Sequence, residues 1–328
     1  MRNIILILFV FNFLSSCKHS TPTIGFMLPH MTIKRYAIER EAFTKKVHEL
    51  GGEVVFFSAD NDEVKQSEQL KEMLNKIDIL VLDPVNRFTA AGMVRSAHEK
   101  NIKVISYDRL IANCDVDKYV TFNAADIGTQ MCEYVTNKMP AGRYFILGGD
   151  KSDMNAVMID DAIVKFLTPS VKSGKIQVVY KTFIEKYAED EAELKVTRYL
   201  NLSQDAPDVV IASSDMLALG ALNAFKKLDL GKNILITGQN GELFACKNIL
   251  KGLQAMTIYK PVQKLAEMAA ELSVKMAKGD NVDDSFQNKI FNGKVDVPST
   301  LLKVITVDAT NMKIILADGM FSEADLNK

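Results

Sequence analysis

The sequence has no tryptophan, only four cysteines among 328 residues, and no excess of charge of either sign. Forty Lys and Arg residues stand against 41 Asp and Glu residues, which gives a net charge of −1. This balance provides no basic field to concentrate nucleic acid and no acidic tail for a cationic partner, so it favours a neutral ligand. A hydrophobic content of 48% permits a large core, and the length indicates about two domains.

Long hydrophobic runs are almost as scarce, and the one that stands out lies at the N-terminus. Arg2 precedes an apolar run over residues 4–14, and Leu14-Ser15-Ser16-Cys17 follows it directly. The run is too short for a permanent membrane span but is typical of a secretory signal. We expect residues 1–16 to be a signal peptide, Cys17 to carry a lipid, and residues 17–22 to form a tether that holds the protein at the cell envelope, facing the periplasm or the cell exterior. A buried N-terminal helix or strand is the alternative.

The remaining cysteines do not indicate a metal site. Cys114, Cys132 and Cys246 are an odd number without CxxC spacing, and the four histidines lack the spacing of metal ligands. A bridge between Cys114 and Cys132 is one alternative. The other is that the cysteines are small buried apolar residues, which suits the helix-like surroundings of Cys132 and Cys246. We expect no metal and no cofactor.

From residue 23 onward, short apolar runs alternate with longer amphipathic segments. This alternation is typical of βαβ units, in which helices cover parallel sheets. The predicted strands cover residues 24–28, 53–58, 79–82, 103–107, 144–147, 177–183, 209–212, 234–237 and 255–259. These are too many for one ordinary open sheet, so we expect an α/β protein with two Rossmann-like lobes and a binding cleft between them. Candidate joins are residues 120–123, 259–261 and 297–299.

Polar residues collect where the predicted strands end, which is where open α/β sheets bind their ligands. Those residues are Lys34, Arg35, Asp108, Arg109, Asp153, Asn155, Tyr187, Ser214, Asp215, Gln239, Asn240 and Lys260. Planar donors, carboxylate acceptors, amides and an aromatic face together suit a polyhydroxylated ring. The sequence therefore predicts a sugar site. Alternatively, pairs such as Asp108-Arg109 only cap strands or form surface ion pairs.

Ordered landmarks along the chain resemble those of the bacterial xylose-binding proteins, a family of periplasmic sugar-binding proteins. The matching segments are residues 24–27, 34–36, 106–109, 148–149 with Asp153 and Asn155, 212–215, 237–240, 256–261 and 295–299. The resemblance runs from about Ile24 to about Phe321. It implies a type I periplasmic binding protein, in which three crossover segments join the lobes. Residues 23–123 with 261–297 would form the N-terminal lobe, and residues 124–260 with 298–328 the C-terminal lobe.

The resemblance also implies a set of sugar contacts, and this chain keeps most of them in type. The matching positions are Arg35, Asp108, Arg109, Asp153, Asn155 and Lys260. Four positions depart from the family's pattern: Tyr36 and Tyr187 replace Trp, Ser214 replaces Asn, and Asn240 replaces Asp. A Tyr ring still offers a face to sugar C–H groups. The neutral amide of Asn240, however, is a weaker acceptor than a carboxylate, so the resemblance leaves the identity of the sugar open.

Other functional classes find less support in the sequence. No GxGxxG follows the first predicted strand, and neither GxxxxGK[ST] nor GxSxG occurs. Asp83, Asp108 and Asp153 could form a carboxylate pair of the glycosidase type, although Asp83 before Pro84 is more simply a loop residue at a strand end. A sugar-responsive transcription regulator would need a DNA-reading helix-turn-helix and basic charge near one end, and the sequence shows neither. We expect a monomeric binding protein, not an enzyme, that serves an ABC-type permease or, alternatively, a membrane sensor.

Overall fold

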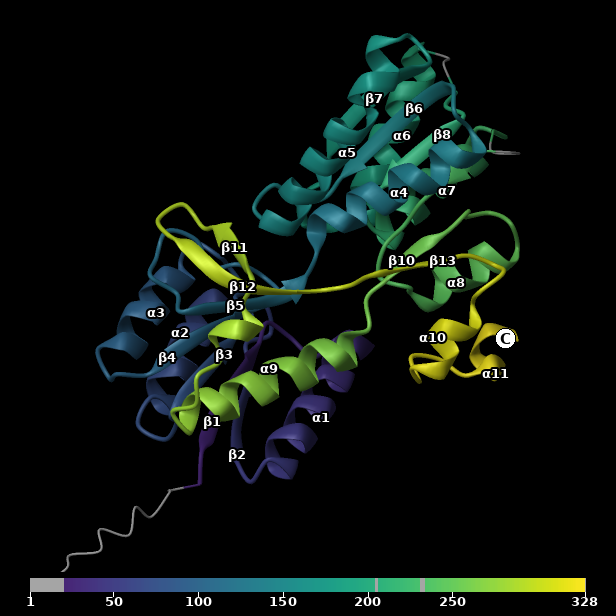
Figure 1. Cartoon of the computed structure of the whole chain (residues 1–328). Coiled ribbons are helices and arrows are strands. Elements are labelled where there is room, and N and C mark those ends of the chain that lie inside the picture. The colour runs from purple at the N-terminus through teal and green to yellow at the C-terminus, as the bar shows by residue number, and fades with distance from the viewer. Residues whose placement is uncertain (1–20, 204–205, 231–233, 328) are drawn as a thin grey trace, which may run out of the picture.

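A computed structural model describes residues 21–203, 206–230 and 234–327, and it contains two open α/β sheets (Figure 1). The predicted signal peptide, Cys17 and residues 18–20 of the predicted tether lie outside these described residues. Among the described residues, no helix is both long enough and apolar enough to cross a membrane. Parallel strands covered by helices on both faces confirm the α/β prediction.

The first sheet has seven strands in the order β11-β12-β5-β4-β3-β1-β2. Their bounds are Thr23–Leu28 (β1), Glu53–Ser58 (β2), Ile79–Leu82 (β3), Lys103–Tyr107 (β4), Lys118–Phe122 (β5), Asn288–Phe291 (β11) and Asp296–Leu302 (β12). Only β11 runs antiparallel to its neighbour. Helices α1 (Lys34–Glu49) and α9 (Val262–Ala277) cover one face, and α2 (Glu63–Met73) and α3 (Ala90–His98) cover the other. Phe26 and Met27 of β1 accordingly belong to separate core clusters.

The second sheet has four parallel strands in the order β7-β6-β8-β9. Their bounds are Gly142–Gly148 (β6), Ile176–Phe183 (β7), Val209–Ala212 (β8) and Leu235–Ile236 (β9). Helices α4 (Ala124–Lys138) and α5 (Met154–Lys172) pack on one face, and α6 (Glu189–Ser203) and α7 (Asp215–Lys227) on the other. The remaining elements near this sheet are the short helices η1 (Glu185–Tyr187), α8 (Leu243–Leu250), α10 (Lys313–Ala317) and α11 (Glu323–Asn327) and the antiparallel pair β10 (Thr257–Tyr259) and β13 (Ile305–Val307).

Side-chain caps begin the helices that follow strands β5, β6 and β8. Asn123 accepts a hydrogen bond from the backbone N–H of Asp126 at the start of α4, and Asp153 accepts one from Asn155 at the start of α5. Ser214 caps α7 in the same way through the N–H of Leu217. Each cap satisfies a backbone donor that the helix itself leaves unpaired. The caps also fix polar side chains at the carboxyl ends of the strands.

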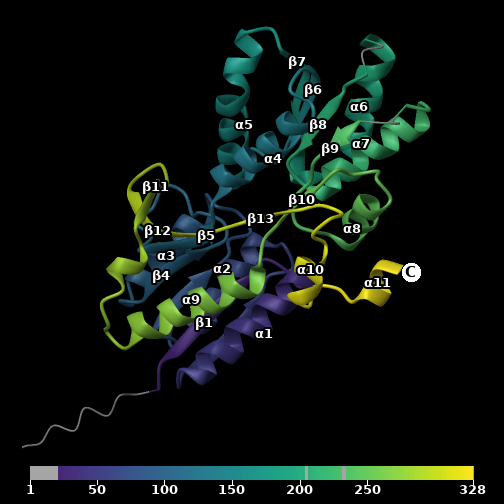
Figure 2. The ribbon, with the colours of Figure 1, turned by 45° about the vertical axis from the view of Figure 1, so that its right-hand side comes forward.

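The chain crosses between the sheets three times, after β5, after β10 and after β12 (Figures 1 and 2). The structure corrects two details of the prediction. Residues 120–122, expected as a join, are the end of β5 in the interior of the first sheet. Residues 298–302, assigned to the C-terminal lobe, continue β12 in the first sheet because they pair with β5 and β11. The third crossing therefore begins at about residue 303.

The three cysteines in the described chain are buried and free. The alternative of a Cys114–Cys132 bridge is therefore wrong in this structure. Cys132 lies in α4 within the core cluster that also contains Cys246 of α8, whereas Cys114 belongs to the separate cluster under α2 and α3. These thiols fill apolar space, as expected for free buried cysteine.

Candidate functional site

A cavity of about 700 Å³ lies between loops of the two sheets. Loops that follow strands of the first sheet contribute His30, Val85, Asn86, Arg87, Phe88 and Arg109 to its lining, and the second sheet contributes Asp150, Asp153, Met154, Lys186 and Tyr187. Most of these residues are polar or charged: the first sheet supplies bases, and the second supplies two acids and a lysine. A ligand in this cavity would therefore contact both sheets at once.

Arg35 joins two carboxylates beside this cavity. Its Nη2 lies 2.5 Å from Glu39 Oε1 and 3.0 Å from Asp108 Oδ2. Glu39 is fully buried, and burial raises its pKa to about 7 although Arg35 opposes the shift. Burial also disfavours ionisation of Asp108, but the positive charges of Arg35, Lys260 and Arg109 outweigh it and lower the pKa of Asp108. Asp108 is therefore an ionised acceptor at neutral pH.

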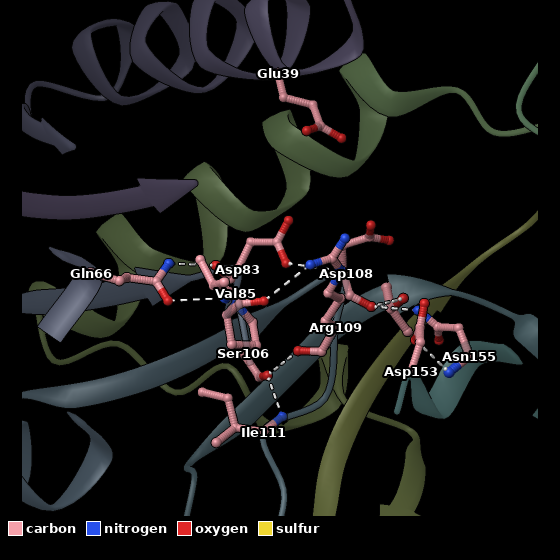
Figure 3. Close-up of polar contacts among 12 residues, drawn as sticks. Glu39, Gln66, Asp83, Val85, Ser106, Asp108, Arg109, Ile111, Asp153 and Asn155 are labelled. Carbon is pink, nitrogen blue, oxygen red and sulfur yellow. Dashed lines mark hydrogen bonds and ion pairs between the residues drawn. The ribbon is translucent and has the colours of Figure 1, made fainter. Parts of the chain in front are cut away.

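The backbone of Asp108 forms a bridge to the second sheet. Its φ of 56° turns the chain directly after β4, and its carbonyl oxygen accepts hydrogen bonds from the hydroxyls of Tyr119 at 2.8 Å and Thr121 at 2.9 Å. The third donor, Asn155 Nδ2 at 2.9 Å, comes from the first turn of α5. Figure 3 shows Asn155 beside Asp108. The amide of Asn155 thus connects the two sheets.

Arg109 points from the end of β4 into the large cavity, where its side chain is 33% exposed. Its Nη1 donates to the carbonyl oxygen of Pro84 at 3.3 Å, and its Nε lies 3.9 Å from Asp83 Oδ1. These two contacts involve only Nη1 and Nε of the guanidinium. Most of its five N–H donors therefore remain available to a ligand.

Asp153 and Tyr187 line the same cavity from the second sheet. The Tyr187 hydroxyl donates to Asp153 Oδ2 at 2.9 Å, while Asp153 Oδ1 caps α5. The Tyr187 ring lies directly over Gly149, where a Cβ atom would come within 2.1 Å of the ring. Gly149 is therefore needed for the observed position of the ring. Together the two residues combine an aromatic face with a carboxylate acceptor.

A small cavity of about 40 Å³ is lined by Arg35. Its lining includes Asn240 and Lys260, together with Met320 and Phe321 from the C-terminal segment. Burial lowers the pKa of Lys260, although Asp108 opposes the shift. Asn240 has a φ of 109°, and its Oδ1 accepts a hydrogen bond from Gln239 Nε2 at 3.3 Å.

The structure brings most of the predicted site residues together, but in different settings. Arg109, Asp153 and Tyr187 line the large cavity, and Arg35, Asn240 and Lys260 line the small one. Asp108 and Asn155 lie between the sheets and bond to each other. Tyr36 is buried, with its ring against His30 and the Arg35 guanidinium. Ser214 lines neither of these two cavities, and its hydroxyl caps α7.

Comparison with known proteins identifies the family to which this fold belongs. Residues 24–281 match the family described as "Periplasmic binding protein domain". The chain belongs to the periplasmic binding protein family. The D-xylose-binding periplasmic protein of Haemophilus influenzae is 34% identical over 95% of this chain and 94% of its own length, and that of Escherichia coli is 34% identical over 92% of each. The resemblance to xylose-binding proteins is therefore confirmed.

A solved structure supports the same assignment. An ABC transporter solute-binding protein from Clostridium phytofermentans, with bound β-D-glucose, superposes with a TM-score of 0.82 and is 28% identical. The match covers 93% of this chain and 99% of that chain. The fold of this periplasmic binding protein is thus the type I arrangement that the resemblance implied.

Some cavity residues of this periplasmic binding protein escaped the sequence reasoning. His30, Arg87 and Phe88 line the large cavity, and all three lie in loops that follow strands β1 and β3. The same strand-end argument that selected Arg109 could have found them. Glu39 also escaped, although its i, i+4 spacing from Arg35 on α1 indicates an ion pair. Across residues 21–203, 206–230 and 234–327, no group of three or more His, Cys, Asp or Glu side chains could hold a metal ion.

Proposed function

We propose that this protein is a lipid-anchored extracytoplasmic receptor that binds a monosaccharide, D-xylose or a related pentose or hexose, and delivers it to an ABC-type sugar transporter. The observation that carries the proposal is that Arg109 from the first sheet and Asp153 and Tyr187 from the second line one cavity. Guanidinium donors, a carboxylate acceptor and an aromatic face match the edge and faces of a sugar ring. The names of the xylose-binding relatives and the glucose-bound neighbour support the same class of ligand.

Binding, in this proposal, proceeds by closure of two lobes that correspond to the two sheets with their helices. The sugar first meets Arg35, Asp108 and Arg109 and then recruits Asp153 and Tyr187 from the other lobe. A ligand favours the closed state because only there does it contact both lobes. The three crossings after β5, β10 and β12 are the proposed hinges, and the Asn155–Asp108 hydrogen bond is a contact that closure can retain.

The exact sugar depends on positions where the chain departs from the xylose-binding pattern. The Ser214 hydroxyl already caps α7, so we do not assign it a direct sugar contact. Asn240 provides a neutral amide beside the cations Arg35 and Lys260. Because Asn240 replaces an Asp of the xylose-binding pattern, the proposal includes sugars whose ring substituents differ from those of xylose.

A ligand screen tests the proposed class of ligand. We expect one or more neutral monosaccharides to raise the unfolding temperature of the purified protein, because a ligand at 100 times its Kd stabilises by about 2.7 kcal/mol. Amino acids and nucleosides are the controls and are expected to cause no shift. A shift with a nucleoside or an amino acid, and none with any sugar, would refute the proposal.

The anchor is tested separately, in cells fed labelled palmitate. We expect label in the wild-type protein and none in Cys17→Ala, because the proposed lipid is attached at that thiol. Cys246→Ala is a matched control, since Cys246 is buried in the core. Label that survives Cys17→Ala would show that the anchor assignment is wrong.

A further inference from the structure

Asp83 is a buried carboxylate that the proposed sugar contacts do not include. It follows β3 directly and is completely inaccessible to solvent, and neither of its carboxylate oxygens has a hydrogen-bond partner. A buried carboxylate in this state is costly, because it has lost its hydration without gaining donors in exchange. An unsatisfied group of this kind requires a reason other than stability.

The backbone around Asp83 is held firmly in place (Figure 3). The buried side chain of Gln66 donates to the carbonyl oxygen of Asp83 at 2.9 Å and accepts from the N–H of Val85 at 2.9 Å. The N–H of Asp83 also donates to the carbonyl oxygen of Met27 on β1 at 2.9 Å. The carboxylate therefore projects from a fixed position.

The backbone of Arg109 is held just as firmly on the neighbouring strand end. The Ser106 hydroxyl donates to the carbonyl oxygen of Arg109 at 2.6 Å and accepts from the N–H of Ile111 at 3.0 Å. Both backbones are thus fixed, and the adjustable part is the Arg109 side chain. Its guanidinium lies 3.9 Å from Asp83 Oδ1 at Nε, and its other end reaches the large cavity.

Charges around Asp83 favour this one partner. Burial raises the pKa of Asp83 well above its ordinary value, and among the neighbouring groups Arg109 opposes this shift most strongly. Asp108, Arg35 and Glu39 also act on Asp83, and Asp83 acts in turn on the hydroxyls of Tyr36, Tyr107 and Tyr119. Arg35 is already paired with Glu39 and Asp108, whereas no carboxylate of the described residues lies within hydrogen-bonding distance of Arg109. Arg109 therefore favours the ionised form of Asp83 against the effect of burial, and the ionised carboxylate attracts the Nε side of the guanidinium. Nη1 also bonds to the carbonyl oxygen of Pro84, and the remaining terminal N–H groups are left for the cavity.

We propose that Asp83 is a positioning residue for Arg109, which it orients so that the terminal N–H groups of the guanidinium face the sugar. The inference rests on the proposed function, since it assumes that Arg109 binds the ligand. It also explains why the chain retains a buried carboxylate without hydrogen bonds. Residues at binding sites often reduce stability in exchange for function.

The test compares Asp83→Asn with the wild-type protein in sugar titrations and in urea unfolding. Asn has nearly the shape of Asp but no charge. We expect the Kd for the best sugar of the screen to rise about tenfold, as for the loss of one charge-assisted contact. We expect the urea midpoint to stay the same or rise, because the substitution removes a buried carboxyl group whose charged form burial disfavours.

Asp78→Asn is the matched control. Asp78 lies at the opposite end of β3, where its exposed carboxylate accepts a hydrogen bond from the N–H of Thr23. This substitution is expected to leave the Kd unchanged. It therefore distinguishes the effect of removing a carboxylate at the site from the effect of removing one at the other end of β3.

Three outcomes would be decisive. Wild-type affinity in Asp83→Asn would overturn the inference and leave the proposed function intact. A weaker Kd accompanied by a large fall in the urea midpoint would also overturn it, because Asp83 would then be a structural residue. If the wild-type protein itself bound no sugar, the proposed function would fail, and the positioning role would fail with it.

Discussion

At Arg35, a single guanidinium nitrogen contacts two carboxylates that differ in their surroundings. Glu39 is fully buried on α1, whereas Asp108 lies at the end of β4 near the cavities and is surrounded by three cations. The same burial therefore has opposite outcomes: the pKa of Glu39 rises to about 7, and that of Asp108 falls. Asp108 suits a sugar contact because it stays charged, and Glu39 suits a supporting role behind Arg35.

The raised pKa of Glu39 predicts how stability depends on pH. Its ordinary value is 4.5, so between pH 4.5 and 7 the folded protein binds a proton that the unfolded chain has released. The free energy of unfolding should therefore fall as pH rises through this window, by on the order of 3 kcal/mol for this group. Glu39→Gln should make the decline shallower. Urea unfolding at a series of pH values measures it.

Two comparisons make this prediction specific. Burial also raises the pKa of Asp215 to about 7, so part of the decline should persist in Glu39→Gln. Glu41→Gln removes an exposed carboxylate from the same helix and should leave the decline unchanged. Equal pH profiles for the wild type and Glu39→Gln would show that Glu39 is ionised throughout this range.

Among the elements, the loop between β6 and α5 depends on a single small residue. Gly149→Ala would place a Cβ atom within 2.1 Å of the Tyr187 ring, so the ring must move. The hydrogen bond from Tyr187 to Asp153 would then be lost, which corresponds to about 1 kcal/mol, or about fivefold in sugar affinity. Isothermal titration of the variant measures this loss.

Gly92→Ala in α3 provides the control for this substitution. Its added Cβ would meet only Arg95 Nη2, at an ordinary 3.7 Å. Sugar affinity should be unchanged and helix stability slightly higher, since Ala is favoured over Gly within a helix. Unchanged affinity in Gly149→Ala would mean that the position of Tyr187 does not matter for binding.

Most strands of the sheets could be predicted from the sequence, and the failures have a physical cause. Residues 53–58, 79–82, 103–107 and 209–212 form strands with the predicted bounds, because each is a short apolar run between polar or turn-forming residues. The end of β5 appeared only as an extended join. The end of β5 pairs with β12, which lies more than 170 residues later in the chain. A local sequence pattern cannot indicate a pairing between such distant segments.

The candidate site divides in the same way. Arg109, Asp153 and Tyr187 could be predicted from their places after strands, and they line one cavity. The bond from Asn155 to the carbonyl oxygen of Asp108 could not be predicted, because this contact depends on how the two sheets approach each other. Nor does the sequence indicate the complete burial of Asp83, which was interpreted only as a loop residue.

At the scale of the whole molecule, contacts between distant segments surround the cleft. Asn155 of α5 bonds to Asp108 after β4, and Lys34 of α1 bonds to the carbonyl oxygen of Met320 near the C-terminus. Tyr259 in turn donates to Asp318 Oδ2 at 3.1 Å, which ties the C-terminal segment to β10. Binding at the cleft and the relative position of the two sheets are therefore physically connected.

The central claim is that a neutral monosaccharide binds at Arg109 between the two sheets. Calorimetric titration of D-xylose and the best sugar of the screen into wild-type protein and Arg109→Ala tests it most directly. We predict one bound sugar per wild-type chain and no detectable binding to Arg109→Ala, with cooperative unfolding retained in both proteins. Wild-type affinity in a folded Arg109→Ala variant would contradict this account of the site.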